Sequence, residues 1–445
     1  MTPPPILDDA AEDDAAADDA AMGQAGGLTA GFFGLPHLGG TYSVFRTLRP
    51  GLASRGIALR WLGTGTAASR ALLHTPWPSE MARGMVVAPQ ESEERSQAEA
   101  LVAHIEQGGY DAVFVNVLAD RVQTNAVRYL DRRVLRIMVV HNITPATYAA
   151  AAAVRDWVHA TVCVSPRIRD DLVARHGFAP ERTHVILNAI APPTVPRRPR
   201  PPVTTRAPLR LLSLGRVEDA SKGVLWLPRI LRRLDGLPCE LTVGGDGPDL
   251  EALRQDCACF GRQVRFLGAV PAERVPILMA EHDALVFPSR FEGFGLTLAE
   301  AMAAGCVPVA SAIHGVTDAV VDHGRTGLLF PVGAANQAAL AILRLIMEPG
   351  LLERLSAAAR LEAARRFDAG RAADAYAALL EDVRRHPPAI AEPLPLSRWH
   401  YPSGLTDGGL RRFVPRRIKN LLRMLRERSA LALASAGFGH PGERP

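Results

Sequence analysis

The residues of this chain best suited to chemistry lie in one glycine-rich stretch. It runs Ser-Arg-Phe-Glu-Gly-Phe-Gly-Leu-Thr-Leu-Ala-Glu over residues 289–300, directly after an apolar run that ends at Pro288. Glycine lets the backbone approach a ligand closely, and the N–H groups at a helix start attract anions such as a diphosphate. Glu292 and Glu300 carry carboxylates that accept hydrogen bonds from hydroxyl groups. The stretch therefore predicts a site for a ligand with both phosphate and sugar hydroxyl groups.

Glu300 also has a role that needs no ligand. Thr297 and Glu300 are spaced as a capping box, in which two side chains bond to backbone N–H groups at the start of a helix. The spacing alone leaves both roles open.

Two basic residues form a second anchor. Arg216 and Lys222 follow the apolar run 209–214. A planar guanidinium and a point charge suit two phosphates at the carboxyl end of a strand, and they would stabilise charge on a leaving group. A lysine in a loop can also be merely solvated.

Two features of the first half could face a ligand. Gly39 and Gly40 lie between the first expected strand and its helix, where they form either a ligand loop or only a turn. His141 directly follows the apolar run 137–140, and a histidine there faces a ligand or has a structural role.

Alternating apolar and amphipathic segments must position these residues. Apolar runs predict strands at 28–33, 57–62, 112–117, 134–140, 161–164, 184–187, 209–214, 240–243, 264–266, 284–287, 307–310 and 327–330. Amphipathic segments predict helices at 41–54, 92–107, 120–131, 146–157, 166–176, 223–234, 248–258, 272–280, 297–304 and 316–321, with 334–385 almost wholly helical. This pattern predicts an α/β fold of two Rossmann-like, doubly wound parallel-sheet domains that face each other across a cleft.

Composition divides the chain into five parts. They are an acidic, disordered leader (1–27), an N-terminal domain (28–190), a proline-rich linker (191–207), a C-terminal domain with terminal helices (208–385), and a basic tail (386–445).

Charge and cysteine content exclude several function classes. The net charge of +5 comes from a −7 leader, a +7 segment at 411–428 and a basic linker, so the body is nearly neutral and bulk nucleic-acid binding is not expected. Five scattered cysteines predict reduced thiols and no zinc site. No signal peptide and no run of about 18 apolar residues is present, which predicts a cytoplasmic protein.

The basic tail contains an amphipathic helix. Ile418, Leu421, Leu422 and Leu425 share one face, with basic residues around them. Residues 413–431 could lie on the inner face of an anionic membrane, or the apolar stripe could pack on the body of the protein. Both alternatives stay open.

The two anchors together resemble glycosyltransferase family 4, a family of retaining enzymes with the GT-B fold. Its signature of two glutamates separated by seven residues matches Glu292 and Glu300, and its Gly-Arg followed by Lys-Gly matches 215–216 and 222–223. The resemblance covers roughly residues 28–385. It implies that the N-terminal domain lies on the acceptor side and that the C-terminal domain binds the nucleotide sugar.

The resemblance implies a role for each candidate residue. Glu292 would contact the donor sugar, Glu300 the ribose, and Arg216 and Lys222 the diphosphate, together with the loop Gly293, Phe294, Gly295 and Leu296. His141 would lie by the reacting carbon, and Gly39 and Gly40 near the diphosphate and the acceptor. Asn188 is followed by Ala189 where the family usually has Gly, and Asp318 stands where many relatives have Glu, so neither receives a role.

The implied activity is that of a retaining hexosyl- or glycosyltransferase. It would move a sugar from a nucleotide-diphosphate sugar to a glycan, lipid-linked or small-molecule acceptor. No cofactor is expected, and no metal, because Arg216 and Lys222 supply positive charge and no Asp-x-Asp motif occurs. The alternatives are a nucleotide-sugar epimerase or hydrolase on the same fold, and a non-catalytic nucleotide-sugar-binding partner protein.

Overall fold

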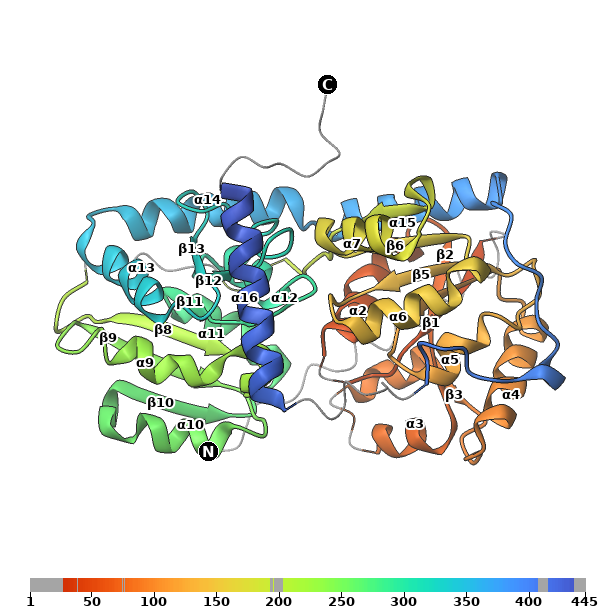
Figure 1. Cartoon of the computed structure of the whole chain (residues 1–445), viewed down its shortest axis with the longest axis horizontal. Coiled ribbons are helices and arrows are strands. Elements are labelled where there is room, and N and C mark those ends of the chain that lie inside the picture. Colours follow the sequence, from red (N-terminus) through yellow and green to blue (C-terminus); the bar gives the residue numbers. More distant parts are fainter. Residues whose placement is uncertain are drawn as a thin grey trace, which may run out of the picture. The chain divides into compact units, whose positions relative to one another are not determined.

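The chain divides into two compact units (Figure 1). The computed structural model describes residues 27–37, 39–73, 75, 77–192, 195, 203–406 and 415–435. The first unit comprises 1–164, 168–189 and 369–408, and the second 165–167, 190–368 and 409–445. The expected leader up to residue 26, most of the linker, and residues 407–414 and 436–445 of the tail lie outside the described residues.

The first unit is built on a parallel sheet of seven strands in the order β3-β2-β1-β4-β5-β6-β7. The strands are β1 (Leu28–Phe33), β2 (Ile57–Thr64), β3 (Gly84–Val87), β4 (Ala112–Asn116), β5 (Leu135–Val140), β6 (Ala160–Cys163) and β7 (Thr183–Val185). Its helices include α2 (Gly40–Ala53), α3 (Gly65–Leu72), α4 (Glu94–Gln107), α5 (Arg121–Ala126), α6 (Pro145–Val154), α7 (Pro166–His176) and α15 (Ala369–Arg385).

The second unit is built on a parallel sheet of six strands in the order β10-β9-β8-β11-β12-β13. The strands are β8 (Leu209–Leu214), β9 (Cys239–Gly244), β10 (Val264–Gly268), β11 (Ala284–Phe287), β12 (Val307–Ala312) and β13 (Leu328–Pro331). The helices include α8 (Asp219–Lys222), α9 (Leu227–Leu231), α10 (Leu250–Cys257), α11 (Val275–Glu281), α12 (Leu296–Ala304), α13 (Ala335–Met347), α14 (Leu351–Arg366) and α16 (Arg416–Ser435).

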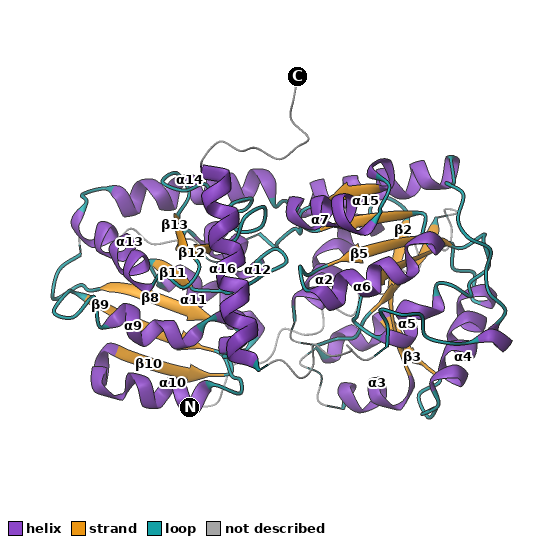
Figure 2. Cartoon of the chain, viewed as in Figure 1, coloured by secondary structure: helices purple, strands orange, loops and turns teal. Residues whose placement is uncertain are grey.

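The inner strands consist of apolar runs because helices cover both faces of each sheet. Every residue of β4, β5, β11 and β12 is buried, as a strand covered by helices on both faces requires. Figure 2 shows the strands of each unit lying among helices. The prediction of two parallel-sheet α/β domains is confirmed.

Strand order fixes where ligands can bind. In the second sheet β8 pairs with β11, while β9 and β10 lie on the other side of β8. The strand order therefore reverses between β8 and β11, and ligands of open parallel sheets bind beyond the carboxyl ends of strands at such a point. The strand order of the first sheet reverses in the same way between β1 and β4.

The C-terminal part of the chain returns to the first unit, which differs from the domain limits expected from the sequence. Helix α15, expected in the C-terminal domain, groups with the first unit, where Arg55 on the segment after α2 pairs with Asp374 at 2.7 Å. Residues 386–406 follow it, and the rings of Tyr129 and Trp399 lie 4.8 Å apart. Amphipathic periodicity marks α15 as a helix but does not say which sheet it covers.

The prediction of a helix at 316–321 is wrong, because these residues form turns between β12 and β13. The Oγ1 of Thr317 donates to the carbonyl of Ser311 at 2.6 Å and accepts from the backbone N–H of Ile313 at 2.7 Å. These bonds tie the turn at Thr317 to the end of β12.

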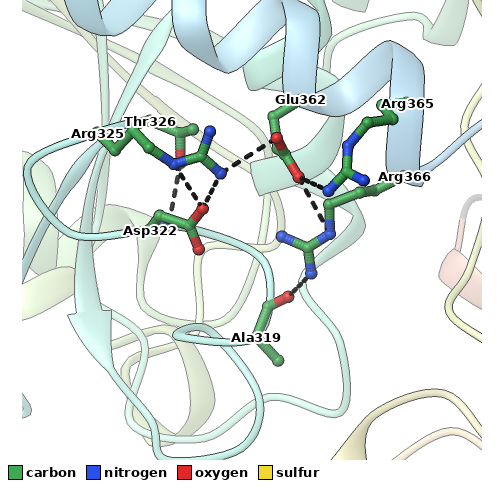
Figure 3. A network of polar contacts seen from close by, with 7 residues as sticks. All are labelled: Ala319, Asp322, Arg325, Thr326, Glu362, Arg365 and Arg366. Carbon is green, nitrogen blue, oxygen red and sulfur yellow. Dashed lines mark hydrogen bonds and ion pairs between the residues drawn. The ribbon is translucent and has the colours of Figure 1, made fainter.

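A charged network holds the far end of these turns to α14 (Figure 3). Glu362 is nearly buried and accepts from Arg365 at 2.7 Å, while Arg325 reaches it at 3.1 Å and also pairs with Asp322. Arg366 donates to the carbonyl of Ala319. A hydrogen bond from Arg365 and a second from Arg325 lower the pKa of Glu362 against the opposing effect of burial, so the carboxylate stays ionised.

Candidate functional site

Lys222 and Glu292 form an ion pair beyond the neighbouring strands β8 and β11. The Nζ of Lys222 lies 2.6 Å from Oε1 of Glu292, and Ser289 Oγ donates to the same oxygen at 2.7 Å. The side chains are 31% and 11% exposed, so both remain within reach of a ligand. Residues 70 positions apart in the sequence thus meet where the strand order reverses.

Arg216 lines the same pocket as Lys222. The pocket lies beyond β8 and β11 and also involves Gly215, Pro288 and Ser289. Arg216 is exposed, and within the described part of the chain its side chain has no hydrogen bond or ion pair. Two cationic side chains at one pocket, one of them without a partner among the described residues, can bind two phosphate groups.

Arg290 fastens the Lys222 loop to the loop after β11. Its Nε donates to the carbonyl of Asp219 and its Nη2 to the carboxylate of the same residue, both at 2.7 Å. Its guanidinium carbon lies 3.9 Å from the centre of a Trp226 ring, and its backbone N–H donates to Ser221 at 2.7 Å. This support could not be predicted from the sequence, where the only signal is that Arg290 stands close to Glu292.

Gly223 brings the two loops into backbone contact. It has φ +63°, and a Cβ there would lie 2.2 Å from the carbonyl oxygen of Pro288. No larger residue fits without moving one of the loops. The glycine after Lys222 is therefore required by the packing of the pocket wall.

The capping role considered for Glu300 is wrong. Helix α12 begins at Leu296 after Gly295, which has φ +89° and serves as N-cap without a side-chain bond. Thr297 is thus already inside the helix. Glu300 has no hydrogen bond or ion pair among the described residues, and burial raises the pKa of its carboxyl group to about 7. A desolvated carboxyl group without a protein partner is typical of a ligand site.

The remaining residues of the glycine-rich loop support the start of α12. Gly293 and Phe294 are buried, and the ring of Phe294 packs edge-on against Phe367 at 5.6 Å. Leu296, at the first position of α12, is partly exposed. The loop is therefore held in place by its aromatic side chain, while its backbone leads into the helix.

In the first unit, His141 directly follows β5 and contacts the end of β4. Its Nε2 lies 2.7 Å from Oδ1 of Asn116, whose amide nitrogen donates to the carbonyl of Phe33 at 2.8 Å. Burial lowers the pKa of His141 to about 4. The ring is therefore neutral at pH 7, with its proton on Nε2 and an unprotonated Nδ1.

Asn116 was missed by the sequence analysis. It is the last residue of an otherwise apolar strand, and this is the signal that could have identified it. Gly39 and Gly40 lie at the N-cap and first position of α2, beyond β1.

Two further residues can be placed. The carboxylate of Asp318 accepts from the backbone N–H of Val316 and lies 3.1 Å from Nδ1 of His314. Asn188 is buried, and its Oδ1 has no partner among the described residues. That same part of the chain contains no group of three or more His, Cys, Asp or Glu side chains arranged to hold a metal ion.

Residues 208–348, which contain the pocket, match the family model described as "Glycosyl transferases group 1". This stretch is a group 1 glycosyl transferase domain. It includes Arg216 and Lys222 as well as the two glutamates, Glu292 and Glu300.

Curated relatives match part of the chain. Glycogen synthase of Mycobacterium tuberculosis is 30% identical over 220 residues, which is 47% of this chain and 51% of the relative. The GDP-mannose-dependent alpha-(1-6)-phosphatidylinositol monomannoside mannosyltransferase of that organism is 34% identical over 144 residues, 30% and 36% of the two chains. The chain thus spans about half the length of the first of these relatives, and less of the second.

Solved structures show the same fold over more of the chain. Anabaena HepE in complex with UDP and glucose has a TM-score of 0.63 at 18% identity, covering 80% of this chain and 100% of that chain. Sucrose-phosphate synthase from Thermosynechococcus elongatus has a TM-score of 0.63 at 19% identity, covering 80% and 99%. The fold is that of GT-B glycosyltransferases.

Proposed function

We propose that this protein is a retaining glycosyltransferase that uses a nucleotide-diphosphate sugar without a metal ion. The observation that carries the proposal is the pocket beyond β8 and β11, where Arg216 and Lys222 lie together and Lys222 reaches Glu292. A diphosphate needs two cationic contacts and a sugar needs a hydrogen-bond acceptor, and this pocket offers both.

The donor would occupy this pocket through its charged and hydroxyl groups. Arg216 and Lys222 would bind the diphosphate, helped by backbone N–H groups at the start of α12. Lys222 has three N–H donors, so it can keep its bond to Glu292 while it binds a phosphate oxygen. Glu292 would then accept from the sugar hydroxyls, and Glu300 in its ionised form from the ribose.

Two cations stabilise the departing diphosphate in the proposed reaction. The bond between the anomeric carbon and the phosphate oxygen breaks, and the acceptor oxygen bonds to that carbon from the same side, which preserves its configuration. The departing phosphate oxygen takes the proton of the acceptor hydroxyl. Negative charge grows on the diphosphate at this stage, so Arg216 and Lys222 stabilise the transition state more than the bound donor.

The comparisons support the class of donor. HepE was solved with UDP and glucose and also with UDP-glucose, and several relatives are named for sugar transfer. The acceptor side, to which the sequence analysis assigns His141, Gly39 and Gly40, stays a prediction, as do the acceptor itself and a cytoplasmic location. A neutral His141 could accept a hydrogen bond from a sugar or acceptor hydroxyl at Nδ1.

Donor turnover tests the proposal. UDP-, GDP- and ADP-sugars are incubated with a panel of glycan, lipid-linked and small-molecule acceptors, and the anomeric configuration of any product is read by NMR. We expect one donor to give a product of retained configuration, with turnover lowered at least about 100-fold by Lys222→Ala or Glu292→Gln. Conversion of the donor alone as the main activity would favour an epimerase or hydrolase, and nucleotide binding without product would favour a non-catalytic binding protein.

A further inference from the structure

Helix α16 contacts the second unit with one face and leaves a different face apolar and exposed. Ile418, Leu421, Leu422 and Leu425 are 48%, 50%, 59% and 50% exposed. At 3.6 residues per turn these four residues form one continuous stripe along the helix, which we call the α16 stripe. The alternative in which the stripe packs on the body is therefore wrong, because the helix packs by another face and leaves the stripe exposed.

The packed face of α16 is held by specific contacts. Glu427 pairs with Arg167 at 3.5 Å, and the two side chains are 6% and 8% exposed. Arg428 donates from Nε to the carbonyl of Val332 at 2.9 Å. The sulfur of Met424 lies so close to Gly333 that a Cβ there would be 2.5 Å away. These contacts fix the rotation of the helix on the unit (dark blue in Figure 1) and so determine which side chains face outward.

Charge around the α16 stripe has one sign. Residues 411–428 contain eight basic residues and one acid, Glu427. That acid is buried against Arg167 on the packed face. By helical spacing Lys419 and Arg426 lie along one edge of the stripe, and Arg428 lies along the other. The outward surface is thus apolar along its centre and basic at its edges among the described side chains.

These features favour a lipid surface over a second copy of the chain. A stable dimer buries about 1,200–2,000 Å² in total, far more than four side chains on one helix provide. A second copy would also bring two strongly basic segments together, whereas an anionic bilayer attracts each of them. None of the described helices is long and apolar enough to cross a membrane, so contact would be along the surface.

We infer that α16 is a membrane-docking element. It inserts the α16 stripe into the interface of an anionic bilayer while its packed face stays on the second unit. This inference does not depend on the reaction proposed above, since it rests on the helix alone. The sequence predicted only that residues 413–431 could contact a membrane. The structure identifies the face of α16 that would bind lipid and the contacts that hold the helix to the second unit.

Vesicle co-sedimentation of the full chain tests the inference. Vesicles of phosphatidylcholine alone are compared with vesicles containing about one third phosphatidylglycerol. We expect binding only to the anionic vesicles, weakened by 0.5 M salt and reduced at least about 10-fold by Leu421→Glu with Leu425→Glu. The matched control is Leu340→Glu with Leu361→Glu, which changes two exposed leucines of α13 and α14 and should bind as the unchanged chain does.

Three results would overturn the inference. They are no binding to anionic vesicles, equal loss of binding in the control variant, and a dimer in light scattering that the Leu421→Glu and Leu425→Glu changes disrupt. A lost fold would not be mistaken for lost docking, because each variant is also checked for an unchanged melting temperature. Nucleotide binding is measured separately, so failure of docking leaves the proposed reaction untouched.

Discussion

Replacing Glu300 by glutamine should stabilise the unliganded protein at alkaline pH. Burial raises the pKa of this carboxyl group from its ordinary 4.5 to about 7. The folded chain therefore holds a proton that the unfolded chain has lost, and stability falls as pH rises from about 4.5 through 7. The difference between a pKa of 4.5 and one of about 7 corresponds to roughly 3 kcal/mol of stability, which glutamine does not lose because it stays neutral.

The gain should depend on pH in a defined way. At pH 5 residue 300 is neutral in both folded proteins, and ionisation of Glu300 in the unfolded chain leaves a difference of only about 1 kcal/mol. At pH 8 we expect Glu300→Gln to be more stable by about 2–3 kcal/mol, or about 5–10 °C in melting temperature. The matched control is Glu273→Gln, an exposed glutamate of the same unit, which should show no such gain.

The same change should weaken nucleotide binding. A hydrogen bond to a charged group contributes about 1.5–3 kcal/mol, so loss of the carboxylate should weaken binding at pH 8 about 10- to 100-fold. Thermal unfolding at pH 5 and 8 and calorimetric titration with nucleoside diphosphates measure the two effects. A variant that is no more stable than the parent at pH 8 would refute the desolvation of Glu300, and unchanged binding would refute its ribose role.

Two further changes test the supporting residues. Arg290→Met removes the hydrogen bonds between the two loops, so we expect kcat to fall about 10- to 100-fold with a smaller change in the acceptor KM. Arg290→Lys should recover only part of this loss, because lysine lacks the planar fork of arginine. Equal rates for all three proteins would contradict the positioning role. Asn116→Asp places a carboxylate beside His141 and should raise the pKa of His141 from about 4 by at least about one unit. NMR titration measures this pKa, and the acidic limb of the pH–rate profile should move to higher pH with it. An unmoved pKa would exclude the assigned contact between His141 and residue 116.

The motif residues were predictable because their signals are local. Buried runs such as residues 284–287 are read directly from the sequence, and the glycine-rich stretch that holds Glu292 follows one of them. Parallel topology then brings the ends of β8 and β11 together, so the meeting of Lys222 and Glu292 follows from sequence and fold.

What the sequence could not provide are choices that depend on packing. Arg290 could have been an exposed loop residue, and only the structure shows that it bonds to Asp219 and stacks on Trp226. Helix α15 has an amphipathic pattern that would cover either sheet equally well. In α16 the apolar stripe left membrane contact and packing on the body equally open, and only the structure shows that a buried ion pair and a methionine hold the helix by another side.

Calorimetric titration with UDP, GDP and ADP tests the central site most directly, because it separates binding from turnover. Lys419, the other lysine of the chain, provides the matched control. We predict that one nucleoside diphosphate binds the parent and the Lys419→Ala variant alike, and binds Lys222→Ala at least about 10-fold more weakly. Equal affinity of all three proteins, or no binding of any nucleoside diphosphate, would contradict a diphosphate site at Arg216 and Lys222.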